Sequence, residues 1–199
     1  MLKVGITGGI GSGKSTITSL FHDLGVPIYN SDERAKWLLS NDVDLVDQIK
    51  ILFGQESYSN NKLNRAHIAN IVFQDNDMLK ELNAIVHPLV KIDFENWLLL
   101  QKKEPLVIKE AAILIESGAY KELDVLIVVL ADKKTRIKRV INRDNVSKED
   151  VEKRMETQIS DSERLKFANF SVDNNTDQSN LKMQVGELYK QLLSYPKNK

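Results

Sequence analysis

Glycines followed by a lysine and a serine near the N-terminus form the part of the sequence best suited to bind phosphate. Residues 8–15 read GGIGSGKS and fit the P-loop pattern G-x-x-x-x-G-K-[ST]. Glycines let several backbone N–H groups approach a phosphate chain, and the start of a following helix adds partial positive charge. Lys14 is expected to reach the β- and γ-phosphates, and the Ser15 hydroxyl to bind Mg²⁺. The expected nucleotide contacts are Gly11, Ser12, Gly13, Lys14, Ser15 and Thr16.

The residues on both sides of this loop match the elements that a P-loop requires. Leu2, Val4 and Ile6 alternate with smaller or more polar residues, which predicts a short strand. After the loop, one face of a helix is predicted by Ile17, Leu20, Phe21 and Leu24. Gly25 then suits the C′ position of that helix. A glycine-rich turn without a ligand is the competing interpretation, and this flanking context argues against it.

Asp32 is the first candidate for catalysis outside the loop. It follows a second predicted strand, over 26–29, and open α/β sheets bind ligands beyond the carboxyl ends of their strands. In a kinase, a carboxylate at this place orients the acceptor hydroxyl and takes its proton. The residue types alone fit equally well an N-cap for a helix predicted over 33–39.

Three arginines share one face of a predicted basic helix over 132–144. Arg136, Arg139 and Arg143 are spaced at 0, 3 and 7. Arginine forks match the equatorial oxygens of a transferring phosphoryl group, and a kinase needs a segment that closes over its nucleotide. A solvated face that pairs with neighbouring acids is the other interpretation.

Three further side chains have two interpretations each. Glu110 lies at the end of a predicted strand, and Glu116 follows six residues later. Either carboxylate can approach Mg²⁺, directly or through water, or can instead make a local structural contact. His87, before Pro88, either faces the acceptor or marks a break in a helix.

The composition excludes several functional classes. The chain has 199 residues, a formal net charge of zero and no cysteine. Zero net charge gives no basic field for nucleic acid or a membrane surface, and the lack of cysteine excludes disulfides and thiolate metal sites. No apolar run approaches the roughly 20 residues of a membrane span. The sequence goes straight into the first predicted strand, so we expect no cleavable signal peptide. We therefore expect a cytoplasmic protein that binds neither nucleic acid nor membranes, as a monomer or a weak homo-oligomer.

Strands alternating with helices around the P-loop predict an α/β fold with a five-stranded parallel sheet. The strands are expected at 2–7, 26–29, 106–110, 125–130 and 170–172. The helical stretch between the second and third strands is far longer than the dozen or so residues that a crossover needs. We expect a single kinase domain with its core at 1–32 and 104–199, a helical acceptor-domain insertion at 33–103, and a lid at about 132–165.

Local signals predict details of the connections. The polar stretch 55–62 reads as a loop, and Asn64 is placed to cap the helix after it. Pro88 is expected to kink or restart the longest helix, over 75–103. Ser147 and Asp150 form a pattern similar to a capping box.

An ordered set of motifs then runs through the whole chain. It reads ITGGIGSGKS at 6–15, DLGVPI at 23–28, Asp32 with Ala35-Lys36, HPL at 87–89, ILIESG at 113–118, Arg139, Arg143-Asp144, Gln158, Arg164 and Asn174-Asn175. With this set the sequence resembles the dephospho-coenzyme A kinase family nearly from end to end. The P-loop alone is shared by many nucleotide hydrolases and kinases, whereas the ordered set is far more specific.

The resemblance implies a P-loop kinase core that uses ATP and Mg²⁺ to phosphorylate the ribose 3′-hydroxyl of dephospho-coenzyme A, the last step of coenzyme A synthesis. It implies that Asp32 is the catalytic carboxylate and that Lys14, Arg139 and Arg143 stabilise the transferring phosphate. It also implies that Asn174 lies near the adenine of ATP. The metal is expected at Ser15 and Glu110, and the acceptor at Asp32, Lys36, His87 and Glu116.

The sequence departs from the family pattern at three places. Asn30 stands where the family usually has the first of two aspartates, so Asp32 is the only acid of that pair. Glu110 begins a stretch where the family often has Asp-x-Pro, and Glu110 would keep the acidic role with a longer reach. Asn174-Asn175-Thr176 lacks the usual final glycine.

Three other functions compete with this one. Another small-molecule kinase, for a nucleoside or shikimate, would share the core, but the HPL motif and the long insertion argue against it. A GTPase would need Asn-Lys-x-Asp, and the nearest match, NKLN at 61–64, ends in asparagine. A regulatory ATP-binding module without catalysis is favoured only by Asn30.

Overall fold

The computed structural model describes residues 1–60 and 62–196, with two compact units. The first unit comprises Met1–Asn30 and Gln101–Lys199, and the second comprises Ser31–Leu100. The insertion predicted over 33–103 differs from the second unit by two residues at its start and three at its end. Its role as an acceptor domain remains a prediction.

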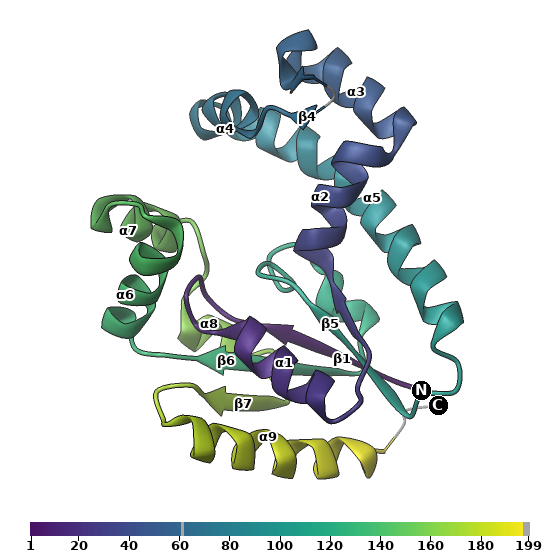
Figure 1. The fold of residues 1–199 in the computed structure, drawn as a ribbon, viewed down its shortest axis with the longest axis vertical. Coiled ribbons are helices and arrows are strands. Elements are labelled where there is room, and N and C mark those ends of the chain that lie inside the picture. Colours follow the sequence, from purple (N-terminus) through teal and green to yellow (C-terminus); the bar gives the residue numbers. More distant parts are fainter. Residues whose placement is uncertain (61, 197–199) are drawn as a thin grey trace. The chain divides into compact units, whose positions relative to one another are not determined.

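A five-stranded parallel sheet runs through the first unit, in the order β2-β5-β1-β6-β7 (Figure 1). The strands are β1 (Leu2–Thr7), β2 (Ile28–Asn30), β5 (Leu106–Glu110), β6 (Val125–Leu130) and β7 (Phe170–Asp173). The predicted α/β class and parallel sheet are therefore confirmed. The second strand begins two residues later than expected, because Pro27 has no N–H to donate to a ladder.

The first face of this sheet is covered by α1 (Lys14–Asp23) and α9 (Gln178–Leu193), whose buried residues form one core with the strands. The other face packs against the segment after β5. There, a Cβ added to Gly5 would lie 2.6 Å from Leu123 Cδ1, so a side chain at this point of the strand would force Leu123 to move. Residues 125–129 of β6 are buried throughout, as a strand covered on both faces requires.

The register of the central strands brings three chain positions to one edge of the sheet. Ile6 pairs with Glu110 and Asn30 pairs with Glu110, so the ends of β1, β2 and β5 are level. The P-loop follows β1 directly. The carboxyl ends of parallel strands are where open α/β sheets bind their ligands, and the sheet therefore places the P-loop beside Glu110 and Asn30.

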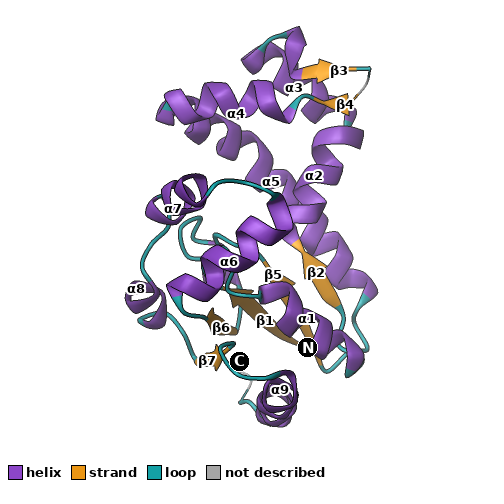
Figure 2. Ribbon diagram, turned by 60° about the vertical axis from the view of Figure 1, so that its left-hand side comes forward, coloured by secondary structure: helices purple, strands orange, loops and turns teal. Residues whose placement is uncertain are grey.

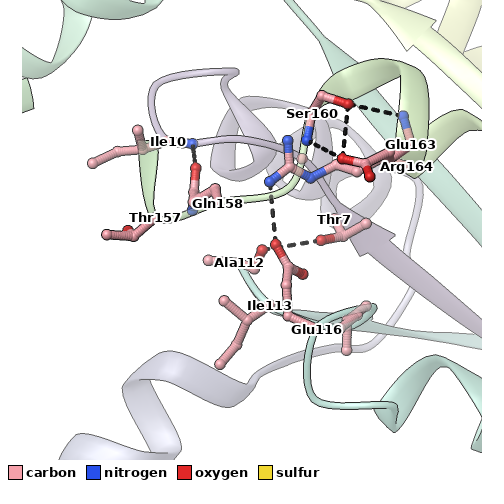
Figure 3. A network of polar contacts seen from close by, with 12 residues as sticks. Thr7, Ile10, Ala112, Ile113, Glu116, Thr157, Gln158, Ser160, Glu163 and Arg164 are labelled. Carbon is pink, nitrogen blue, oxygen red and sulfur yellow. Dashed lines mark hydrogen bonds and ion pairs between the residues drawn. The ribbon is translucent and has the colours of Figure 1, made fainter. Parts of the chain in front are cut away.

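Three helices lie between β6 and β7: α6 (Lys133–Asp144), α7 (Lys148–Glu156) and α8 (Asp161–Leu165). The predicted cap at Ser147 is confirmed, since its hydroxyl accepts from the Asp150 N–H at 3.1 Å. Ser160 begins α8 with a complete capping box to Glu163, drawn in Figure 3. These caps fix where the helices of the predicted lid begin.

The second unit is helical, with α2 (Ser31–Asn41), α3 (Val43–Phe53), α4 (Arg65–Gln74) and α5 (Asn76–Leu100), shown in Figure 2. Asn64 caps α4 as predicted, because its Oδ1 accepts from the His67 N–H at 3.2 Å. α5 continues through Pro88 as one helix, so the proline does not restart it.

The loop expected over 55–62 was wrong. A 3-10 turn, Gln55–Ser57, leads into a two-stranded antiparallel ribbon of β3 (Tyr58–Ser59) and β4 (Lys62–Leu63). Strands of two residues are too short to show an alternating pattern, which explains why the sequence concealed them. Asn61, part of that expected loop and of the NKLN match, lies outside the described residues.

No helix in the described ranges combines the length and the apolar character needed to cross a membrane.

Candidate functional site

The P-loop joins β1 to α1 and has the backbone that phosphate binding requires. Gly11 and Gly13 have φ values of 76° and 91°, in the left-handed region that favours glycine. Gly13 is the N-cap of α1, and its carbonyl accepts from the Thr16 N–H at 3.1 Å. Lys14 Nζ donates to the Gly8 carbonyl at 2.8 Å, which holds the lysine back across the loop. The backbone N–H groups at the start of α1 thus form a site suited to bind an anion such as phosphate.

Asn174 and Arg139 hold the middle of the loop from outside. Both donate to the Ser12 carbonyl, from Asn174 Nδ2 at 2.7 Å and from Arg139 Nη1 at 3.3 Å. Arg139 Nη2 also donates to the Asn174 carbonyl at 3.0 Å. Asn174 is buried, and a Cβ on Gly13 would lie 2.0 Å from its Nδ2. The Gly13 position therefore leaves no room for a side chain.

The three arginines of α6 have different environments, although the sequence presented them as one stripe. Arg136 is buried and Arg139 contacts the P-loop backbone. Arg143 is exposed and forms a bidentate pair with its neighbour Asp144, at 2.7 and 2.9 Å. This hydrogen bonding lowers the pKa of the Asp144 carboxyl. The solvated-face interpretation therefore describes Arg143 and fails for Arg136.

Glu110 is a buried carboxylate beside the start of α1. Its Oε2 accepts from Thr18 Oγ1 and from Asn30 Nδ2, each at 3.2 Å. Thr18 Oγ1 also lies 3.1 Å from the Ser15 carbonyl. Thr18 thus connects the backbone of Ser15 with Glu110. Glu110 is the only carboxylate among the three residues, Ile6, Asn30 and Glu110, that the strand register places side by side.

Glu116 forms an ion pair with a buried arginine, as Figure 3 shows. Arg164 Nη2 lies 3.3 Å from Glu116 Oε1, and the Arg164 side chain is 1% exposed. Arg164 Nη1 donates to Asp161 Oδ1 at 2.9 Å, one turn earlier in α8. Glu116 therefore has a structural partner as well as its expected role at the acceptor.

Comparison with known proteins decides the family. A sequence model described as dephospho-CoA kinase matches residues 2–180. The chain belongs to the dephospho-CoA kinase family. A dephospho-CoA kinase of Bacteroides fragilis (strain YCH46) is 38% identical over 173 residues, which is 87% of this chain and 84% of the relative.

Solved structures agree with this placement in the dephospho-CoA kinase family. A crystal structure of a Thermus thermophilus protein has a TM-score of 0.85 and 32% identity, and covers 96% of this chain and 97% of that one. A dephospho-CoA kinase from Campylobacter jejuni has a TM-score of 0.72 and 25% identity, with the same coverage.

Three residues that the resemblance assigns to the acceptor lie in the second unit. Asp32 and Lys36 are exposed and lie four residues apart on α2, hence on one face of that helix. α2 begins at Ser31, so Asp32 lies within the first turn and is not the N-cap. His87 is half-buried in α5.

Some residues at or near the P-loop could not be given a role from the sequence motifs. The sequence assigns no role to Thr18 and Gln158, which contact the loop, or to Asp161, which holds Arg136. It also groups Arg136 with two arginines whose surroundings differ. Thr18 had a detectable signal, since it follows Ser15 by three residues and so shares its side of α1. Among the described residues, no three His, Cys, Asp or Glu side chains converge on a metal position. A Mg²⁺ ion held mainly by phosphate and water needs no such cluster.

Proposed function

We propose that this chain transfers the γ-phosphoryl group of ATP to the ribose 3′-hydroxyl of dephospho-coenzyme A, giving coenzyme A and ADP, the last step of coenzyme A biosynthesis. The observation that carries this proposal is a fully formed P-loop between β1 and α1, in a chain that belongs to the dephospho-CoA kinase family. Family membership implies use of ATP and a small-molecule substrate.

The donor half of the reaction belongs to the P-loop. Phosphoryl transfer spreads negative charge over the equatorial oxygens of the transferred group, so catalysis consists mainly of positioning and charge stabilisation. Lys14 and Arg139 are proposed as the cations for this task, and both lie at the P-loop, where each contacts a loop carbonyl. Arg143 is exposed on the same helix and is proposed to join them when nucleotide binds. Asn174 adjoins Gly13 and is proposed to flank the bound nucleotide.

Mg²⁺ is proposed to bind at Ser15 with help from Glu110. The exposed Ser15 hydroxyl is the P-loop ligand for the ion, and Glu110 is linked to Ser15 through Thr18. When bound, the ion would supply positive charge that offsets the negative charge developing on the transferring phosphate. The buried Glu110 carboxylate favours a cation nearby, directly or through a water molecule.

Asp32 is proposed as the general base that orients the acceptor hydroxyl and takes its proton. The proposal rests on its place two residues after β2, on its exposure, and on the family motif that it matches. Lys36, His87 and Glu116 are proposed to contact the acceptor. We also propose a cytoplasmic location, a monomer or weak homo-oligomer, and no nucleic-acid partner, consistent with a net charge of zero.

ADP release, measured with dephospho-coenzyme A, adenosine and shikimate in turn, tests both substrate and base. We expect clear preference for dephospho-coenzyme A, and a loss of roughly 10²–10⁴-fold in kcat for Asp32→Asn. Glu33→Gln is the matched control, because Glu33 is the other acid in the first turn of α2. Preference for another acceptor would refute the substrate, and near-native Asp32→Asn activity would refute the base.

A further inference from the structure

The peptide groups around Ile10, in the middle of the P-loop, are held by two side chains that come from one distant segment. The Ile10 N–H donates to Gln158 Oε1 at 2.8 Å, a contact drawn in Figure 3. The Ile10 carbonyl accepts from Arg136 Nε at 2.9 Å. Arg136 lies in α6, and Gln158 lies in the connection between α7 and α8. The donor and the acceptor of one loop residue are thus both fixed by the predicted lid segment.

Arg136 is buried, and its contacts hold its side chain in one position. The residue is 8% exposed, and its Nη1 lies 3.1 Å from Asp161 Oδ2. Burial lowers the pKa of Arg136, while Asp161 acts in the opposite direction. A buried guanidinium needs partners to offset its lost hydration, and Ile10 and Asp161 supply them. Asp161 itself is held by Arg164.

Two glycines of the loop lie against Arg136, one against its side chain and one against its backbone. A Cβ on Gly9 would lie 1.9 Å from Arg136 Nη2, and a Cβ on Gly11 would lie 2.5 Å from the Arg136 carbonyl. The loop therefore packs directly on α6 at Arg136, and two of its glycines are required by this packing. Arg136 is enclosed between the loop and Asp161, whereas Arg143 is exposed and pairs only with its neighbour Asp144 among the contacts described above.

We propose that Arg136, aimed by Asp161, is a positioning residue that acts with Gln158 on the Ile10 peptides and holds the P-loop in the shape that receives the β-phosphate. The inference rests on the proposed function, because it assumes that the loop binds a nucleotide. A loop ordered before binding loses less conformational entropy when the phosphates arrive. Arg136 then contributes to nucleotide affinity without touching the nucleotide.

Titration calorimetry with Mg·ADP and with dephospho-coenzyme A tests this proposal. The variants are Arg136→Gln, Gln158→Ala and their combination, with the exposed Lys138→Gln on the same helix as the control for lost charge. We expect Arg136→Gln to weaken Mg·ADP binding about tenfold, as for a lost hydrogen bond to a charged group, and to leave dephospho-coenzyme A binding within about twofold. In turnover assays the KM for ATP should rise more than the KM for the acceptor. The double variant should lose less than the sum of the two, because both side chains hold one residue.

The outcomes separate the inference from a purely structural role. All titrations are made well below the melting temperature of each variant, which circular dichroism establishes. A variant with a lowered melting temperature and native Mg·ADP affinity would overturn the positioning role. If Arg136→Gln does not fold, Asp161→Asn takes its place and should weaken Mg·ADP binding in the same direction, since it removes the group that aims Arg136; native affinity there would again overturn the inference. A native chain that binds no Mg·ADP would refute the proposed function itself, and the inference with it.

Discussion

Asn30 Nδ2 donates to Glu110 Oε2 at 3.2 Å, between the last residues of the paired strands β2 and β5. Both positions depart from the dephospho-CoA kinase pattern, which usually has an aspartate at the first and often Asp-x-Pro from the second. The structure shows that the two departures meet in one hydrogen bond. Glu110 has a longer side chain than aspartate, and its carboxylate accepts from Thr18. Asn30 beside it carries a neutral amide, whereas an aspartate at that position would repel the Glu110 carboxylate. The pair therefore keeps one buried carboxylate next to the P-loop.

Asn30→Asp should destabilise the chain in a pH-dependent way. It would place a half-buried carboxylate about 3 Å from the buried Glu110, and like charges raise the pKa of one of them above its unfolded value. The variant's stability is then retained below the unfolded pKa of about 4 and lost as the pH rises through the folded pKa. Thermal unfolding without divalent cations should show a larger deficit at pH 7.5 than at pH 5, with about 1–3 kcal/mol lost at the higher pH.

Asn30→Ala is the control for this prediction. It removes the hydrogen bond to Glu110 without adding charge, so its deficit should change less between the two pH values than that of Asn30→Asp. Equal deficits for Asn30→Asp would mean that the introduced carboxylate does not sense Glu110.

The sequence was sufficient to predict the P-loop, the parallel sheet and two helix caps. Those features depend on local signals: glycine spacing, β-branched runs such as 125–130, and the side chains of Asn64 and Ser147. Helix and cap signals act over three or four residues, and they can be read without knowledge of the rest of the fold.

The different environments of the three arginines of α6 could not be predicted in the same way. A spacing of 0, 3 and 7 places Arg136, Arg139 and Arg143 on one face, but it does not say where along that face the P-loop lies. The loop meets the first and second of them through contacts more than 120 residues apart in sequence. The Asn30 departure likewise had no explanation until the register paired it with Glu110.

Gly13→Ala should abolish most of the activity. Gly13 has φ 91°, and its added Cβ would lie 2.0 Å from Asn174 Nδ2, whose hydrogen bond holds the Ser12 carbonyl. Displacement of these groups by about an ångström should lower kcat/KM roughly 10²-fold. Steady-state assays with ATP varied measure this loss.

Gly25→Ala is the matched control for Gly13→Ala. Gly25 also has a left-handed φ, 83°, yet nothing lies within 4 Å of the added Cβ. It should cost about 1–2 kcal/mol in stability and leave kcat/KM close to native. Similar kinetic losses in both variants would show that backbone strain, and not contact with Asn174, governs the loop.

Gly186→Ala should stabilise the chain. Gly186 lies inside α9, and no atom lies within 4 Å of an added Cβ. Alanine in a helix interior is favoured over glycine by about 0.5–1 kcal/mol, so the melting temperature should rise by roughly 1–4 °C. Gly5→Ala is the opposite case, because its Cβ would lie 2.6 Å from Leu123 and should lower the melting temperature. A fall for Gly186→Ala would mean that α9 needs the glycine for a reason other than space.

Tyr58→Phe should reveal a stability contribution from the second unit that disappears at high pH. The Tyr58 hydroxyl donates to the Leu39 carbonyl at 2.6 Å, and burial raises the pKa of Tyr58 to about 12. The folded state therefore favours the neutral phenol, whereas the unfolded chain ionises near its usual pKa of about 10. The contribution is fully present below pH 10 and is lost as the pH rises toward 12. Urea unfolding followed by circular dichroism should show Tyr58→Phe about 1 kcal/mol less stable than native at pH 8, the usual worth of one hydrogen bond. At pH 11 that difference should shrink, because only the native chain loses stability through this ionisation; an unchanged difference would show that Tyr58 titrates normally in the folded protein.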